Sequence, residues 1–459
     1  MKWFRGLDFF ALSIVSTPAY AGGGFDLAMA RGDETLRYQS PSGATELCFV
    51  PKHLPGFEYR GKEGSKDREA ERELCALDLY KEGPTKLNGG VAACPKVTST
   101  SAAIEFQELE TEGTKKQLES VEMCGYTRPT DTLTKFKTTD NDRACAYGAG
   151  AMLSYHLSRA LGDVLHVPTM VLRTVDIETM QKVSVQALRT RTNGTIRKSY
   201  QNYIDAYRNP AMWPAASTLY TNDFKQVYGF LRGKVKGDVT HPGWTDNNEG
   251  VGFESLESVR DVFAPAPARR LFGKTLSQAA LQRMIAARDV GDLIVLDQLT
   301  SQADRYTGLN LGALSYYYFV EEGKKLSSLE KRKVDKGEKP KPANAMLIRR
   351  MVAKDNDCTF INGNRNARYA YVERLRHLHP RTYAGVQRLA SLWNRDKTLQ
   401  EFLSTELNMT ARYIAVFQKN LQSVSQTLLQ NCRAGRLRLD LDSQNHFFGV
   451  DAEPGCEVQ

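Results

Sequence analysis

The chain has 459 residues, a formal net charge of +9 and an ordinary apolar fraction of 41%. This length suits two or three domain-sized units or one two-lobed enzyme, and the apolar fraction allows a sizeable core. The positive charge favours anionic partners such as nucleotides, acidic proteins or membrane surfaces. The basic residues are spread along the chain and rarely interleaved with aromatic residues, so the composition argues against a nucleic-acid partner.

The first 21 residues have the pattern of a secretory signal peptide. Lys2 and Arg5 give a positive start, residues 9–15 form an apolar segment, and residues 19–21 (Ala-Tyr-Ala) form an A-x-A cleavage site. No later stretch is long and apolar enough to span a bilayer. The sequence therefore predicts that residues 1–21 are removed and that the mature protein is periplasmic or secreted.

The eight cysteines are an even number, which behind a signal peptide argues for disulfides formed in an oxidising compartment. No CxxC spacing occurs and histidine is scarce, so we expect no zinc site. We expect Cys432 and Cys456 to be joined to each other or to Cys358. The remaining connectivity stays open, because eight cysteines allow about a hundred pairings.

The first half of the chain mixes short strands with helix. Residues 35–50 read as a hairpin around a turn tripeptide, and the alternation of residues 132–137 predicts a strand. Small and apolar residues predict a helix over 144–161. Residues 167–173 read as an edge strand opened by proline, and residues 182–188 as a second strand.

The second half is mainly helical by pattern. Residues 224–231 suggest a helix, and residues 276–289 have the spacing of a clean amphipathic helix. Residues 323–342 are charged and end in proline, which predicts an exposed insertion. Residues 368–429 read as mostly helical, with a break near Pro380.

The stretch 291–310 carries the first candidate for chemistry. It begins with the apolar run 293–296 and ends in a polar turn with Asp304, Arg305 and Asn310. A buried segment that delivers an Asp-Arg pair and then an Asn into a loop is the arrangement of a phosphoryl-transfer catalytic loop. There the Asp accepts the proton of the attacking hydroxyl, and the Asn helps to hold a metal. The alternative is a structural turn, in which Asp304 and Arg305 cap the turn and form an ion pair without a catalytic role.

A second acidic motif follows further along the chain. The apolar residues 351–353 lead into Asp355, Asn356 and Asp357. An Asp in this setting can hold Mg²⁺ against nucleotide phosphates. An Asx turn after a strand is the structural alternative.

The order of these motifs resembles a known family. The helix segment 154–161, the Val167-Pro168 strand, the Asp304-Arg305 loop and the 355–357 motif follow one another as in the secretory-pathway kinases of the Golgi casein kinase type. HipA-like and phosphatidylinositol kinases are more distantly similar. The resemblance covers about residues 133–360, and the signal peptide gives the chain the look of a bacterial secreted member.

The resemblance implies an α+β, two-lobed protein-kinase-like fold that uses ATP with Mg²⁺ or Mn²⁺. The catalytic pair would be Asp304, as the base, and Arg305. The metal would be held by Asp355, with Asp357 or Asn310 as helper. The nucleotide phosphates would contact Lys135 or Lys137, and the acceptor would be a hydroxyl of a protein, sugar or lipid.

The implied domains follow the signal peptide. A cysteine-rich mixed α/β lobe would span 22–188. A mainly helical lobe would span 189–435, with 323–342 as its charged insertion, and a tail would span 436–459.

One departure from the family leaves alternatives open. The predicted helix over 144–161 has no Glu to partner a phosphate-binding Lys, and Ala151 lies near that position. A disulfide-stabilised pseudokinase, or an envelope binding protein without catalysis, is therefore the alternative function.

Overall fold

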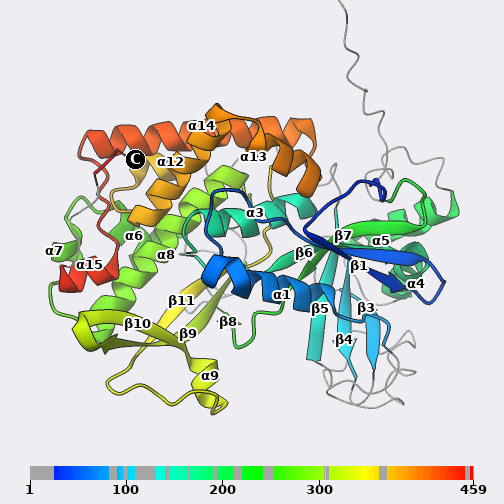
Figure 1. Ribbon diagram of the computed structural model, residues 1–459, viewed down its shortest axis with the longest axis horizontal. Coiled ribbons are helices and arrows are strands. Elements are labelled where there is room, and N and C mark those ends of the chain that lie inside the picture. The colour runs from blue at the N-terminus through cyan, green and yellow to red at the C-terminus, as the bar shows by residue number, and fades with distance from the viewer. Residues whose placement is uncertain are drawn as a thin grey trace, which may run out of the picture.

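The computed structural model describes residues 25–81, 90–96, 102–109, 131–139, 145–163, 165–189, 194–209, 220–240, 253–303, 305, 310–360, 370–449 and 455–457. The predicted signal peptide and Asp304 lie outside these residues. Figure 1 shows a sheet-rich part built from the first half of the chain beside a helix-rich part built from the second half.

The first part is organised around a seven-stranded antiparallel sheet. Its strand order is β1-β2-β6-β7-β5-β4-β3, so β7 lies between β6 and β5 although it comes later in the chain. The strands are β1 (Glu34–Gln39), β2 (Thr45–Val50), β3 (Val91–Pro95), β4 (Ala103–Glu108), β5 (Asp131–Thr138), β6 (Met170–Asp176) and β7 (Gln226–Arg232). The hairpin predicted over 35–50 and the strand predicted over 132–137 are both confirmed, as β1–β2 and β5.

Helices cover both faces of this sheet. Successive side chains of a strand point to opposite faces, so neighbouring residues pack against different helices. Leu172 and Phe230 pack in the same core cluster as α3, whereas Val171 and Leu231 pack in the cluster that holds α4 and α5. The helices of this part are α1 (Ser65–Cys75), α3 (Gly148–Ala160), α4 (Ile177–Arg189) and α5 (Gly194–Arg208).

Two predicted elements of this part have the wrong type, and the edge strand predicted over 167–173 is β6, an interior strand that pairs with both β2 and β7. Residues 182–188 were expected to form a strand but belong to helix α4. Its buried residues Met180, Val183 and Ala187 follow a helical period, which the alternation of Val and polar residues concealed. Residues 224–231, expected to be helical, lie largely in strand β7, which is buried on both faces and so shows no alternation.

The second part combines helices with a smaller four-stranded antiparallel sheet. Strand β9 (Leu311–Glu321) pairs with β11 (Met346–Ala353), with β10 (Lys325–Glu330) and with the short β8 (Val239–Thr240). The helices are α6 (Glu257–Phe263), α7 (Ala268–Phe272), α8 (Gln278–Thr300), α9 (Lys331–Asp335), α11 (Tyr371–Arg374), α12 (Pro380–Arg395), α13 (Thr398–Glu401), α14 (Ala411–Arg433) and α15 (Ser443–Phe448). Short turns of other helix types lie at Lys62–Gly64, Phe253–Ser255, Glu322–Lys324 and Phe402–Glu406.

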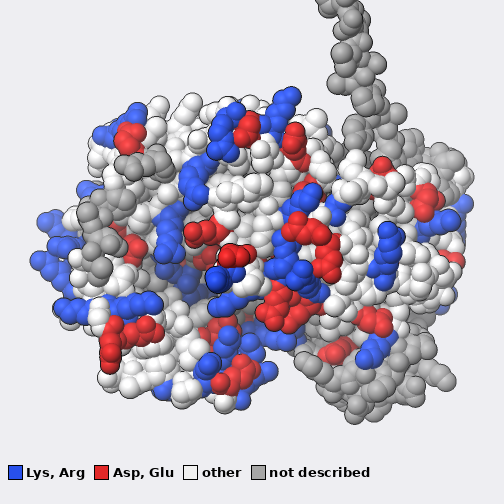
Figure 2. All heavy atoms as spheres, in the orientation of Figure 1, with Lys and Arg blue, Asp and Glu red and all other residues white. Residues whose placement is uncertain are grey.

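This arrangement confirms the α+β class, with a mixed N-terminal part and a mainly helical C-terminal part. The predicted break near Pro380 is the start of α12, where proline occupies the first turn. The charged segment 323–342 is largely exposed as expected, but it carries strand β10 and helix α9. On the face drawn in Figure 2, basic and acidic side chains are interleaved over both parts.

Helix α8 runs through the centre of the second part. The sequence predicted a helix over 276–289, but α8 begins at Gln278 and continues through Gly291 to Thr300. Almost every residue from Ala287 onward is buried, so the apolar run 293–296 is the core segment of a helix surrounded by others. The helix ends at Ser301, immediately before the predicted catalytic loop.

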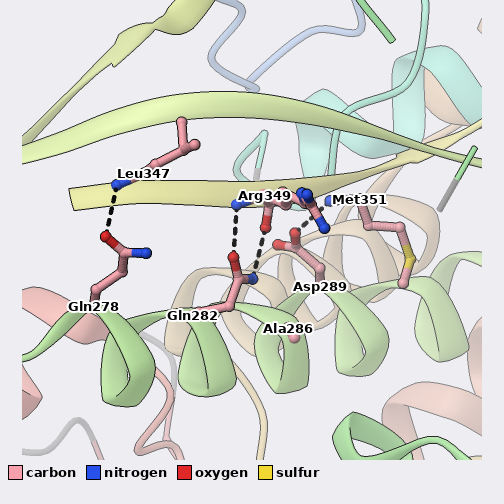
Figure 3. Close-up of a pocket in the computed structure, with 7 residues that line it drawn as sticks. All are labelled: Gln278, Gln282, Ala286, Asp289, Leu347, Arg349 and Met351. Carbon is pink, nitrogen blue, oxygen red and sulfur yellow. Dashed lines mark hydrogen bonds between the residues drawn. The ribbon is translucent and has the colours of Figure 1, made fainter. Parts of the chain in front are cut away.

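Side chains of α8 also close the outer edge of strand β11. The amide oxygen of Gln282 accepts the backbone N–H of Arg349 at 2.7 Å, and a carboxylate oxygen of Asp289 accepts that of Met351 at 2.8 Å (Figure 3). The amide oxygen of Gln278 likewise accepts the backbone N–H of Leu347 at 3.3 Å. These bonds satisfy the alternate N–H groups of an edge strand and fix the strand that leads into the 355–357 motif. The same seam holds a pocket of about 440 Å³, lined by neither of the motif's Asp residues.

Three disulfides join described cysteines. Cys48 pairs with Cys75 between β2 and α1, and Cys145 pairs with Cys358. Cys432 pairs with Cys456, which settles the open alternative for the C-terminal cysteines. Within the described part of the chain there is no free cysteine.

Candidate functional site

The acidic motif lies in a short loop directly after β11. Asp355 has a φ of 46°, a left-handed conformation that Asp tolerates better than most residues. Its side chain is 30% exposed, whereas that of Asp357 is 5% exposed. The loop therefore presents one half-open and one buried carboxylate where the two parts of the molecule meet.

Backbone bonds from both parts hold this loop. The N–H of Tyr147, just before α3, donates to the carbonyl oxygen of Asp357 at 3.0 Å, and the N–H of Lys354 donates to that of Asn310 at 3.0 Å. The side-chain amide of Gln302 donates to the carbonyl oxygen of Asp355 at 3.1 Å. The structure thus brings the backbone of Asn310 beside the acidic motif.

Lys137 on β5 points into the acidic motif. Its ammonium lies 2.9 Å from both carboxylate oxygens of Asp357 and 3.3 Å from one of Asp355. Burial alone would lower the pKa of Lys137, but Asp355 and then Asp357 raise it above its ordinary value. Lys137 is therefore a buried, permanently charged cation between two carboxylates, contributed by a strand more than 200 residues earlier in the chain.

Arg232, the last residue of β7, joins the same cluster. Its guanidinium lies 2.7 Å from Asp355. Burial would raise the pKa of Asp355, but Lys137 and then Arg232 hold it well below its usual range. Sequence reasoning missed Arg232, because the segment before it was read as a helix and nothing local marks this arginine.

Lys135, the other predicted phosphate-binding lysine, has a different partner. It forms an ion pair with Glu105 on the neighbouring strand β4 at 2.7 Å and is 27% exposed. Within the described residues, Lys137 is the one of these two lysines that contacts the acidic motif.

The buried side chain of Arg305 joins helix α8 to both candidate loops. Its side chain is 1% exposed and pairs with Asp297 of α8 at 3.1 Å. It also donates to the carbonyl oxygen of Asn310 at 2.8 Å and to the side-chain oxygen of Asn356. This geometry gives Arg305 a positioning role, because it ties the end of α8 to both candidate loops. Its neighbour Asp304 lies outside the described residues, so its catalytic role stays a prediction.

The start of α3 packs directly against the acidic motif. A Cβ added to Gly150 would lie 1.8 Å from the hydroxyl oxygen of Thr359, so only glycine allows this approach. The Cys145–Cys358 disulfide joins the same two segments. Helix α3 contains no acidic residue, and Ala151 is fully buried. The close partner of Lys137 is Asp357, from the loop after β11.

The donors of the site suit a hard divalent cation. Asp355 and Asp357 offer carboxylate oxygens, which Mg²⁺ and Mn²⁺ prefer. Among the residues that the structure describes, no group of three His, Cys, Asp or Glu side chains converges as a metal site. Two protein carboxylates with nucleotide phosphates completing the shell is the usual arrangement for Mg²⁺ in phosphoryl-transfer sites, so the residues present fit such a metal.

Comparisons with known proteins give weak structural similarity only. No family model and no curated protein matches the sequence. The chain is similar to a crystal structure of the Golgi casein kinase, with 13% identity and a TM-score of 0.38 over 81% of this chain and 79% of the other. A structure of the Golgi casein kinase with Mn/ADP bound is similar at 13% identity and a TM-score of 0.37, over 85% and 80% of the two chains. With TM-scores below 0.5, neither similarity contributes to the function proposed below.

No helix in the described ranges combines the length and the apolar composition that crossing a bilayer requires.

Proposed function

We propose that this chain is a kinase-like phosphotransferase that uses a metal–nucleotide complex to phosphorylate a hydroxyl acceptor. The observation that carries the proposal is the contact of the buried Lys137 with Asp355 and Asp357. A lysine on a sheet strand beside a metal-binding Asp at the junction with a helical part is the core of a phosphoryl-transfer site. The motif order in the sequence supports the same reading.

Each residue has a distinct role in this proposal. Lys137 binds and neutralises nucleotide phosphates, with Arg232 nearby as a second cation. Asp355 and Asp357, with Asn310 as helper, would hold Mg²⁺ or Mn²⁺, which supplies further charge neutralisation when bound. Catalysis in such a site is mostly positioning and electrostatic stabilisation, which is what a rigid, ion-paired cluster provides.

In this proposal the loop after α8 acts on the acceptor hydroxyl. Asp304 would accept the proton of the attacking hydroxyl while the γ-phosphoryl group passes to its oxygen and ADP leaves. Arg305 holds this loop to α8 through Asp297. The acceptor class stays open among protein, sugar and lipid hydroxyls.

The compartment and the domain division belong to the proposal as well. The disulfides are compatible with an oxidising compartment. We therefore propose a periplasmic or secreted protein with residues 1–21 removed. We also keep the predicted tail 436–459. The boundary between the lobes belongs after β7 rather than at residue 188, because α5 and β7 share the sheet and core of the first part.

A calorimetric titration of the oxidised protein with ATP tests the nucleotide site. We expect binding that requires Mn²⁺ or Mg²⁺ and is lost, by at least tenfold in affinity, in Asp355→Asn. The asparagine keeps the shape of the loop but removes the negative charge that a divalent cation needs. Equal affinity in wild type and variant, or binding indifferent to metal, would contradict this assignment of Asp355.

The same titration addresses the alternative function. Metal-dependent ATP binding without any phosphate transfer would make the chain a pseudokinase. No response to nucleotide or metal would point to an envelope binding protein.

A further inference from the structure

The hairpin of β3 and β4 carries a buried lysine that the sequence analysis did not single out. Lys96 directly follows β3 and is 8% exposed. Within the residues that the structure describes, its ammonium makes no hydrogen bond or ion pair. Burying a charged group without a partner is costly, so such a group marks a place where a ligand of opposite charge is expected.

The other cations of this region each have a carboxylate partner. Lys137 contacts Asp357, and Arg232 contacts Asp355. Lys135 pairs with Glu105. Lys96 is therefore the one positive charge of this cluster, as far as the structure describes it, that is left over for an outside anion.

Lys96 lies close enough to the cluster to sense its charges. Burial and then the charge of Lys137 lower the pKa of Lys96 to about 8, against the opposing effect of Asp355. The strand pairing agrees with this, because the N–H of Lys96 donates to the carbonyl oxygen of Ala103, and Ala103 pairs with Lys137 on β5. Lys96 and Lys137 therefore stand in one row across β3, β4 and β5, beside the place proposed for the nucleotide phosphates.

The backbone at Lys96 is fixed from two sides. Its N–H donates to the carbonyl oxygen of Ala103 on β4 at 3.0 Å. The hydroxyl of the fully buried Tyr200, from α5, lies 2.7 Å from the carbonyl oxygen of Ala103 and 3.2 Å from that of Lys96. A hydroxyl that clamps both strands at the base of their turn holds Lys96 in place before any ligand arrives, which lowers the entropic cost of binding.

We propose that Lys96 is a second phosphate-binding lysine, which contacts the terminal phosphates of a nucleoside polyphosphate together with Lys137. This inference rests on the proposed function, because it names a further contact of the same nucleotide. It also makes a distinct claim. Affinity for a nucleotide should depend on its number of phosphates, and the site should bind a polyphosphate that carries no nucleoside.

The test compares wild type with Lys96→Met, Lys96→Arg and the control Lys182→Met, an exposed lysine on α4. Binding is measured by calorimetry with ATP and Mn²⁺, with AMP and Mn²⁺, and with inorganic tripolyphosphate alone. We expect Lys96→Met to weaken ATP and tripolyphosphate about tenfold or more while AMP binding stays within about twofold, since a charge-assisted contact is lost only where the terminal phosphates are present. Lys96→Arg should retain most of the affinity, and Lys182→Met all of it.

The melting temperature without ligand shows whether the variant folds. We expect Lys96→Met to melt at or above the wild-type temperature, because it removes a buried charge that lacks a partner. Wild-type ATP affinity in Lys96→Met, or an equal loss for AMP, would overturn this inference and leave the proposed function standing. Binding of tripolyphosphate through Lys96 without ATP binding would support the anion site and sink the proposed function. No binding of either ligand to wild type would overturn both.

Discussion

Replacing Lys137 with methionine is expected to weaken the binding of ATP with Mn²⁺ by about 100-fold, because hydrogen bonds to charged phosphates are among the strongest that proteins make. Lys137 is buried and already held in place by Asp355 and Asp357, so its charge is pre-organised for the phosphates. Calorimetry on wild type and variant measures the change, with Lys182→Met as the matched control on the surface.

The same variant separates loss of a phosphate contact from collapse of the site. Without Lys137, the two carboxylates lose a competing cation, so Mn²⁺ alone should bind at least as tightly as it does to wild type. Weaker Mn²⁺ binding together with weaker ATP binding would mean that Lys137 only maintains the fold. Unchanged ATP affinity would remove Lys137 from the nucleotide site.

Replacing Arg305 with methionine is expected to lower the free energy of unfolding by about 3–5 kcal/mol, because it leaves a buried carboxylate without its partner. Arg305 and Asp297 are each 1% exposed at their side chains, and Arg305 also joins the loops at Asn310 and Asn356. Urea unfolding measures the loss. Adding Asp297→Asn to the variant should restore part of it, since the double variant buries no unpaired charge.

The effect of Arg305→Met should also depend on pH. Burial raises the pKa of Asp297 to about 6 although Arg305 opposes the rise, so removing Arg305 raises it further. A carboxyl whose folded pKa lies above its unfolded pKa stabilises the fold while it is protonated and loses that contribution as pH rises. The stability gap between wild type and variant should therefore widen as pH increases above about 6. A gap that is constant from pH 5 to pH 8 would contradict the ion pair.

Local patterns predicted the elements that alternation, turn residues or cap residues mark in the sequence. The β1–β2 hairpin, strand β5 and the start of α12 at Pro380 follow directly from alternation and turn or cap residues. The predictions for helix α4 and strand β7 were wrong. The alternation of Val and polar residues concealed the helical period of α4, and β7 is buried on both faces and so shows no alternation. The length of α8 was underestimated because its amphipathic pattern ends near Asp289, where the helix becomes buried on all sides and continues to Thr300.

The candidate site could be predicted only in pieces. Asp355, Asp357 and Lys137 were marked by their neighbours in sequence, and the fold brings them into contact. Lys96 and Arg232 carry no local signal. They reach the site only because β3, β4, β5 and β7 are ordered side by side in the sheet, which pairs residues about 100 positions apart.

Transfer of the γ-phosphate tests the central claim most directly. The mature, oxidised protein would be incubated with labelled ATP and Mn²⁺ in the presence of hydroxyl-rich protein, glycan and lipid mixtures, beside its Asp304→Asn variant. We expect label in one of the acceptors or in the protein itself, with the rate reduced at least 100-fold in Asp304→Asn while Mn²⁺-dependent ATP binding is retained. No transfer by the wild type, or transfer at the wild-type rate by Asp304→Asn, would contradict a phosphotransferase built on this site.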